Sequence, residues 1–135
     1  MTKKRILISL LSVFFLPLFL ASCDQDPFHQ NSRKIAGVYY LQRWEDGKTY
    51  YIDKKNGDGN GGGAIGGIAL KIGWNANYIL ALRKATYQGD VDGWMLIDTK
   101  KQSVIGPLSE AAIANNPELK SIEVYSPQDA WKKLN

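Results

Sequence analysis

The hydrophobic pattern opens with a long apolar segment close to the start of the chain. Residues 6–20 form a run of fifteen that is interrupted by two serines and a proline. A basic triplet at 3–5 precedes this run, and the small residues Ala21 and Ser22 follow it, which is the order typical of an export signal. A membrane-spanning helix needs about 20 residues. We therefore predict a signal peptide over residues 1–22, with a retained N-terminal anchor helix as the alternative.

The only cysteine of the chain comes directly after this segment. Leu20-Ala21-Ser22-Cys23 resembles the lipobox of bacterial lipoproteins, in which the cysteine sulfur receives a diacylglycerol. Two or three acyl chains give stable anchoring. Asp24 resembles an inner-membrane retention signal, which implies the periplasmic face of the inner membrane, with the outer membrane as the alternative. A buried or free thiol is the other interpretation of Cys23, and a disulfide within the chain is excluded.

The segment after Cys23 is polar, and periodic apolar residues begin only near Ile35. We therefore predict a lipidated cysteine and polar tether over residues 23–34, and a single globular domain over residues 35–135. Within that domain, short apolar and aromatic runs alternate with turn sequences, of which Asp46-Gly47 is a strong hairpin signal. Short connections favour antiparallel neighbours. About six strands are expected, over 38–44, 49–52, 65–74, 78–84, 94–98 and 103–105.

The last thirty residues have a different pattern. Ser109 can cap a short helix over 110–114, and residues 122–125 can form a last short strand. Ser126-Pro127 and Asp129 form a helix start, and Ala130, Trp131 and Leu134 share one face of the helix that follows, so Trp131 is predicted to lie in the core. The predicted fold is α+β. It is a curved antiparallel sheet of about six strands with one or two short C-terminal helices, and a partly closed barrel is the alternative.

The net charge of the chain becomes informative once the predicted signal peptide is left out. The full chain has 17 basic and 13 acidic residues. Without Lys3, Lys4 and Arg5, 14 basic and 13 acidic residues remain, a net charge of +1. Such a near-neutral domain has no basic cluster in its sequence, so no nucleic-acid partner is expected.

Three patterns that could carry chemistry have simpler interpretations. Asn56–Gly61 has the alternate oxygens of a calcium loop, but Gly67 stands where the bidentate glutamate belongs. Gly61–Gly67 lacks the lysine and the following helix of a phosphate loop. The single histidine, His29, lies in the tether. We expect no metal and no cofactor.

Carboxylates and aromatic residues remain as candidates. Asp90, Asp92 and Asp98 surround Trp94 and could form an acid–base pair, but loop aspartates commonly bind their own backbone.

The first hairpin carries the more suggestive residues. Alternation places Tyr39 and Arg43 on one face of a strand and Trp44 on the other, with Tyr51 on the next strand. Tyr, Trp and Arg are typical of binding hot spots. We therefore predict partner binding by Tyr39, Arg43, Trp44 and Tyr51, unless both faces are covered.

Three motifs carry a family resemblance over roughly residues 70–115. The sequences Ile72-Gly73-Trp74-Asn75-Ala76-Asn77-Tyr78-Ile79, Gly93-Trp94-Met95-Leu96-Ile97-Asp98 and Gly106-Pro107-Leu108-Ser109 resemble a family of small bacterial lipoproteins with a domain of unknown function. The resemblance implies location and architecture but no activity.

The expected function combines the anchor with the hairpin. We expect a membrane-anchored module that faces the periplasm and binds another envelope protein, as an inhibitor, immunity or exclusion factor, and that is not an enzyme. The alternatives are a structural envelope component without a discrete ligand and a hydrolase that uses Asp90, Asp92 or Asp98.

Overall fold

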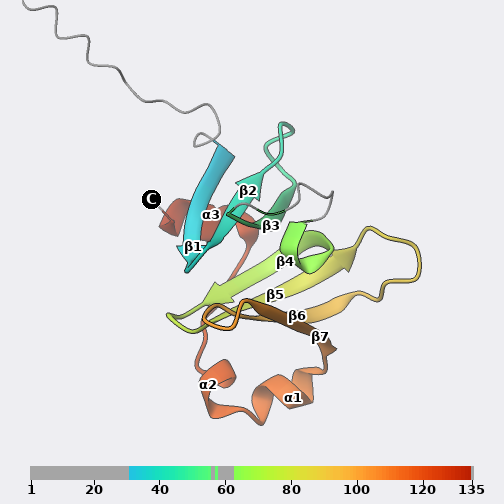
Figure 1. Cartoon of the computed structure of the whole chain (residues 1–135), viewed down its shortest axis with the longest axis vertical. Coiled ribbons are helices and arrows are strands. Elements are labelled where there is room, and N and C mark those ends of the chain that lie inside the picture. Colours follow the sequence, from blue (N-terminus) through green and yellow to red (C-terminus); the bar gives the residue numbers. More distant parts are fainter. Residues whose placement is uncertain (1–30, 56, 58–62, 135) are drawn as a thin grey trace, which may run out of the picture.

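The computed structural model describes residues 31–55, 57 and 63–134, and these form two antiparallel sheets with three short α-helices (Figure 1). One sheet has the strand order β1-β2-β3 and the other has the order β7-β6-β5-β4-β8. In chain order the elements are β1 (Ser32–Ala36), β2 (Tyr39–Arg43), β3 (Tyr50–Lys54), the 3-10 helix η2 (Gly63–Ile65), β4 (Gly67–Trp74), β5 (Tyr78–Ala85), β6 (Gly93–Asp98), β7 (Ser103–Leu108), α1 (Glu110–Ala114), α2 (Pro117–Lys120), β8 (Val124–Tyr125) and α3 (Pro127–Lys133).

The β2–β3 hairpin is held by the turn that the sequence predicts. Gly47 has a φ of +69°, a conformation that glycine adopts without strain. The Asp46 carboxylate accepts the backbone N–H groups of Lys48 and Thr49 at 2.8 Å each and the Thr49 hydroxyl at 2.5 Å. These hydrogen bonds, of which the one from the Thr49 hydroxyl has the largest effect, lower the pKa of Asp46.

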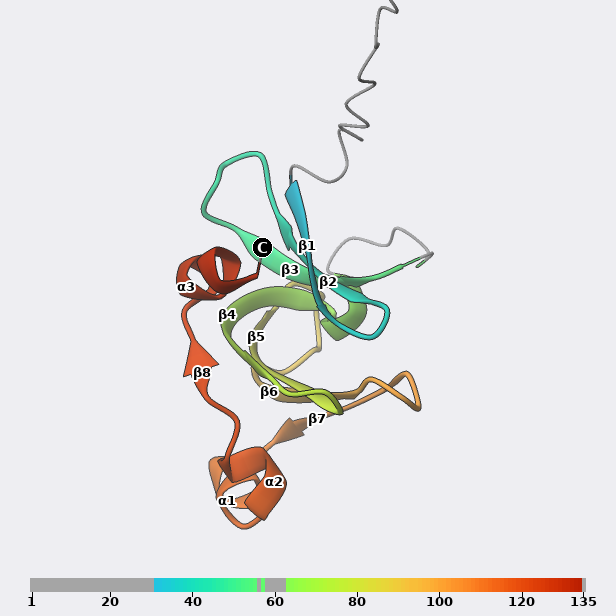
Figure 2. The ribbon, with the colours of Figure 1, turned by 90° about the vertical axis from the view of Figure 1, so that its left-hand side faces the viewer.

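The second sheet is built around the long β4–β5 hairpin, whose turn also has a side-chain cap. Asn75 Oδ1 accepts the backbone N–H groups of Asn77 and Tyr78 at 2.9 and 2.8 Å. The strands pair from Gly67 opposite Ala85 to Trp74 opposite Ile79, with an irregularity after Ala69. Figure 2 shows β4 and β5 curving around the core, so that the first sheet lies over the concave side of the second.

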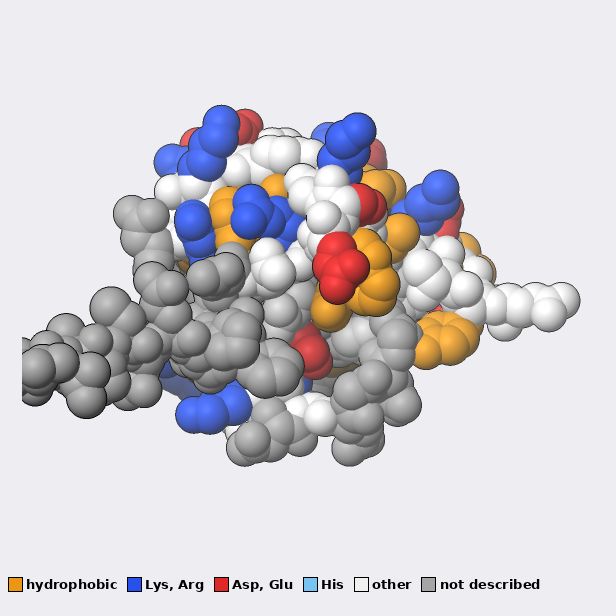
Figure 3. Space-filling view, turned by 90° about the horizontal axis from the view of Figure 1, so that it is seen from above, with side chains coloured by type: hydrophobic (Ala, Val, Ile, Leu, Met, Phe, Trp, Pro, Cys, Tyr) orange, Lys and Arg blue, Asp and Glu red, His pale blue; other side chains and the backbone are white. Residues whose placement is uncertain are grey.

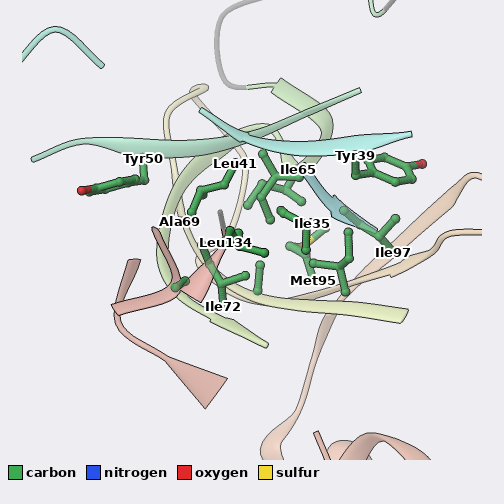
Figure 4. Packing of buried hydrophobic residues seen from close by; sticks show 14 of the residues in the cluster. Ile35, Tyr39, Leu41, Tyr50, Ile65, Ala69, Ile72, Met95, Ile97 and Leu134 are labelled. Atoms are coloured by element: carbon green, nitrogen blue, oxygen red, sulfur yellow. The ribbon is translucent and has the colours of Figure 1, made fainter. Parts of the chain in front are cut away.

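The main core lies between the two sheets. Side chains from both sheets point toward each other there (Figure 4). The largest fully buried side chains of the described residues are Tyr39, Leu41, Ile52, Ile65, Ile72, Ile79, Leu80 and Ile97. All of them except Leu80 belong to this core cluster, and Leu80 points to the opposite face of the second sheet.

Helix α3 completes this core. Its N-cap is Ser126, whose hydroxyl accepts the N–H of Asp129 at 3.2 Å, and Pro127 stands in the first turn. Ala130, Trp131 and Leu134 are all buried. The predicted closing helix and the core position of Trp131 are therefore confirmed.

Helices α1 and α2 pack on the opposite, outer face of the five-stranded sheet (Figure 1). They cover a second apolar cluster that is centred on Leu80, Leu96, Leu119 and Ile122. The Ser109 hydroxyl accepts the N–H of Ala112, which confirms the predicted cap of α1. Helix α2, which the sequence did not predict, begins at a proline behind an Asn cap.

The mainly antiparallel sheet with a few short helices agrees with the predicted α+β class. The single sheet of about six strands is wrong, because the eight described strands form two sheets, and these do not close into a barrel. The additional strand β1 begins at Ser32, within the segment predicted to be a tether. It was missed because it is an edge strand with one buried residue, Ile35, among polar neighbours.

Candidate binding surface

Tyr39 was predicted to bind a partner, but the structure places it in the core. Its side chain is 1% exposed and lies on the inner face of β2 with Leu41. Burial, and secondarily the charge of nearby Asp98, raises the pKa of Tyr39. The prediction for Tyr39 is therefore wrong, because the strand alternation that it shares with Leu41 directs it inward.

Trp44 and Tyr51 lie together on the outer face of the first sheet. Trp44 is 57% exposed and follows the last residue of β2, while Tyr51 is paired with Gln42 across the hairpin. Their ring centroids are 6.1 Å apart and the ring planes meet at 59°, a tilted aromatic pair. Burial, and then Asp53, raises the pKa of Tyr51.

The face around this pair is open in the described part of the chain. Its other residues, Tyr40 and Gln42 on β2 and Lys34 on β1, are half-buried or exposed. The described helices all pack elsewhere, α3 on the core side and α1 and α2 on the second sheet. The alternative that both faces of the hairpin are covered is therefore not met among the described residues.

Arg43 lies on the inner face, where it shares the Trp131 ring with Arg33, a residue of the segment predicted to be the tether. The guanidinium carbons of Arg33 and Arg43 lie 4.4 and 4.6 Å from the centre of the Trp131 ring. Arg33 Nη1 also donates a hydrogen bond to the Trp131 carbonyl. Two positive charges no more than about 9 Å apart repel by about 2 kcal/mol or more at an effective dielectric constant of 20. Among the described residues, no carboxylate pairs with either group.

No protein-family model, curated protein or solved structure matches this chain. The resemblance to a family of small bacterial lipoproteins therefore stays a prediction. Cys23, like His29 and most of the candidate calcium loop, lies outside the described residues. Within the described residues, no helix has the length and apolar character that a membrane span requires.

The three candidate acids are not assembled into one site. Asp92 accepts the N–H of Ala85 at 2.7 Å before β6, and Asp98 accepts the N–H groups of Lys100 and Lys101 after it. The six intervening strand steps separate Asp92 from Asp98 by about 20 Å. Asp90 is exposed in the same loop as Asp92. In the described part of the chain, no three or more His, Cys, Asp or Glu side chains gather as a metal site would require.

Two further features were not predicted from the sequence. Arg83 is buried and joins the end of η2 to the β5–β6 loop, because its guanidinium donates to the carbonyls of Ile65 and Val91 at 2.9 and 2.5 Å. In addition, a hollow of about 250 Å³ opens beneath α1 and α2. Its lining is mostly apolar and comprises Leu80, Trp94, Glu110, Ile113, Ala114, Leu119, Lys120, Ile122 and Val124. It is smaller than the usual small-molecule site of about 300–1,000 Å³.

Proposed function

We propose that this protein is a lipid-anchored module that binds another protein of the bacterial envelope from the periplasmic side of the membrane. The observation that carries the proposal is the aromatic pair that exposed Trp44 forms with half-buried Tyr51 on the outer face of the first sheet. Trp and Tyr supply a large contact area with few rotatable bonds, and they dominate binding energy where they occupy the centre of an interface.

The anchor is the second part of the proposal. It rests on the order of a basic triplet, an apolar run and Ala21-Ser22-Cys23, because a lipidated cysteine needs that processing sequence. Asp24 favours retention in the inner membrane. Such an anchor confines the domain to the membrane surface, which raises its effective concentration toward a membrane-embedded partner.

Within this proposal the binding residues are Trp44 and Tyr51, because both lie on the outer face of the first sheet. Arg43 and Tyr39 face the core side of the hairpin, so neither is part of this outer surface. Tyr40 and Gln42, which share the outer face with the pair, extend the surface along β2.

Cross-linking in intact cells tests the binding surface. Replacing Trp44 or Tyr51 with Ala removes a hot-spot side chain, and each change should weaken partner recovery by roughly 30-fold, equivalent to about 2 kcal/mol. Tyr87→Ala is the matched control, because Tyr87 is a 51% exposed aromatic residue in the β5–β6 loop. Recovery of the same proteins from the wild type and from both outer-face variants would overturn the proposed surface.

Detergent partitioning tests the anchor separately. Cys23→Ser removes the acceptor sulfur, so the protein should accumulate as an unlipidated precursor that no longer incorporates palmitate. A palmitate-labelled membrane protein that persists after this change would contradict lipidation at Cys23. If deletion of the protein makes the envelope generally sensitive, and the Trp44 and Tyr51 variants do not, the structural role would be favoured instead.

A further inference from the structure

The end of the first sheet at which the described chain begins carries an unusual set of cations. Strand β1 starts there at Ser32, opposite Gln42 near the end of β2, and β3 starts at Tyr50 opposite Arg43. The last turn of α3 lies against the same end, because Arg33 donates to the Trp131 carbonyl (Figures 1 and 2). We call this region the tether end.

The central feature of the tether end is the pair Arg33 and Arg43. Both guanidinium groups are half-buried and stack on the ring of Trp131. A stacked guanidinium keeps its outer N–H donors in a fixed fork, the arrangement that donates two parallel hydrogen bonds to two oxygens of a phosphate or carboxylate. Among the described residues, no anion-bearing side chain uses these donors.

Further cations flank the pair. Lys48 is exposed in the hairpin turn, and Lys132 is exposed beside Trp131 on α3. The acids of the hairpin turn are Glu45 and Asp46, and Asp46 is already hydrogen-bonded to Thr49. Figure 3 views the molecule from this end and shows Lys and Arg side chains next to hydrophobic ones, with Asp and Glu side chains also present, on its described surface. A local excess of positive charge therefore exists on a domain that is nearly neutral as a whole.

We propose that Arg33 and Arg43 bind phosphate oxygens of anionic phospholipids, so that the tether end docks on the membrane surface. The inference rests on the lipid anchor of the proposed function, but not on its protein partner. From Cys23 to Ser32 the chain spans at most about 30 Å when fully extended. The anchored lipid therefore holds this end of the domain, rather than the end with α1 and α2, next to the headgroups.

Charge and side-chain chemistry favour the bilayer over a soluble anion. An anionic leaflet presents many phosphates at once, and each nearby Lys or Arg strengthens binding to it by about fivefold. Trp44 is exposed at the same end, and tryptophan favours the boundary between headgroups and acyl chains. A free phosphate ion would use the guanidinium pair alone.

The test reconstitutes the protein purified from cells into vesicles of phosphatidylcholine, alone or mixed with phosphatidylglycerol. Brominated phosphatidylcholine quenches tryptophan that approaches the bilayer, so the part of the quenching that is lost in a Trp44→Phe background reports docking, while flotation of the vesicles reports anchoring. The wild type should show stronger quenching with phosphatidylglycerol, and added salt should reverse the effect. Arg33→Gln combined with Arg43→Gln should lower the ratio of docked to undocked protein by about 30-fold.

The matched control is Lys100→Gln combined with Lys101→Gln, which removes the same charge from the exposed β6–β7 turn. This control should dock like the wild type, and equal losses in both double variants would overturn the proposal. Arg33→Lys combined with Arg43→Lys keeps both charges but removes the stacked guanidinium forks. If this variant still docks while its melting temperature falls, the role of the two cations in lipid binding is separate from their structural role. Undiminished docking of the glutamine variant would also overturn the proposal.

Two further outcomes identify the ligand and the anchor. Inorganic phosphate at constant ionic strength should not displace the docked protein, and displacement would reassign the pair to a soluble anion. If the anchor is absent, phosphatidylcholine vesicles will not retain the protein. In that case retention on phosphatidylglycerol vesicles would still depend on Arg33 and Arg43. A missing anchor is therefore seen with phosphatidylcholine vesicles, and a wrong assignment of the arginine pair is seen with phosphatidylglycerol vesicles.

Discussion

Trp131 is the residue whose replacement tests the described packing most directly. Its side chain is 6% exposed and lies between α3 and the first sheet. The ring is 5.9 Å from that of Tyr50, centroid to centroid, and lies under the guanidinium groups of Arg33 and Arg43. Trp131→Ala removes all of these contacts in one step and leaves two arginines next to a cavity.

The expected loss follows from the burial of this side chain. Truncating a buried tryptophan to alanine costs about 3–5 kcal/mol. Within that total, the ring pair with Tyr50 contributes about 0.5–1.5 kcal/mol. Each stacked guanidinium contributes about 0.5–1 kcal/mol. Because a domain of this size is stable by about 5–15 kcal/mol, the substitution should remove a large part of its stability.

Urea unfolding followed by far-ultraviolet circular dichroism measures the effect. With an m-value of about 1–3 kcal/mol/M, a loss of about 3–5 kcal/mol should lower the midpoint by roughly 1–5 M. Trp44→Ala is the control, since the same substitution at a 57% exposed position should cost about 0.5 kcal/mol or less. A loss at Trp131 within about 1 kcal/mol of that at Trp44 would refute the core position of Trp131 and its contacts with the arginines.

Two further predictions concern the core and the sheet. Because burial raises the pKa of Tyr39 above its ordinary value of 10.0, folding favours the neutral phenol, so its contribution to stability is complete below that pH and falls as the pH rises above it. Thermal unfolding between about pH 8 and 11 should show an alkaline loss that Tyr39→Phe reduces, and an unchanged loss would count against this cause. Gly73→Ala would place a Cβ 2.6 Å from the Glu123 carbonyl and 2.6 Å from the Ile122 side chain. It should cost about 1–3 kcal/mol by separating β8 from β4, and an unaltered melting temperature would contradict that pairing.

Local features of this fold were predictable because their causes are short in sequence. The Asp46-Gly47 turn needs a positive φ and a nearby side-chain acceptor, and both are present within four residues. The caps of α1 and α3 likewise depend on one serine and an N–H three residues later. Such elements are decided by neighbours, so the sequence pattern alone predicts them.

The division into two sheets could not be predicted in the same way. It depends on which strands pair with each other, and β8 joins β4 across about fifty residues of sequence. Strand β1 was hidden because three of its five residues are Ser32, Arg33 and Lys34. Its inward-facing Arg33 contacts the ring and the carbonyl of Trp131, which is nearly a hundred residues away, and no local pattern carries that information.

The tether end explains why composition was a poor guide to the surface of this protein. A net charge of +1 after removal of the signal argues against steering by the domain as a whole. Yet the fold places Arg33 and Arg43 over one tryptophan ring. Asp92 and Asp98 lie elsewhere and accept hydrogen bonds from backbone N–H groups. Electrostatic forces between exposed charges fade within about 10 Å at moderate salt, so a membrane would meet this local group of cations and not the average. The net charge of the domain therefore does not predict its interaction with a membrane, because folding gathers some of the cations at one end.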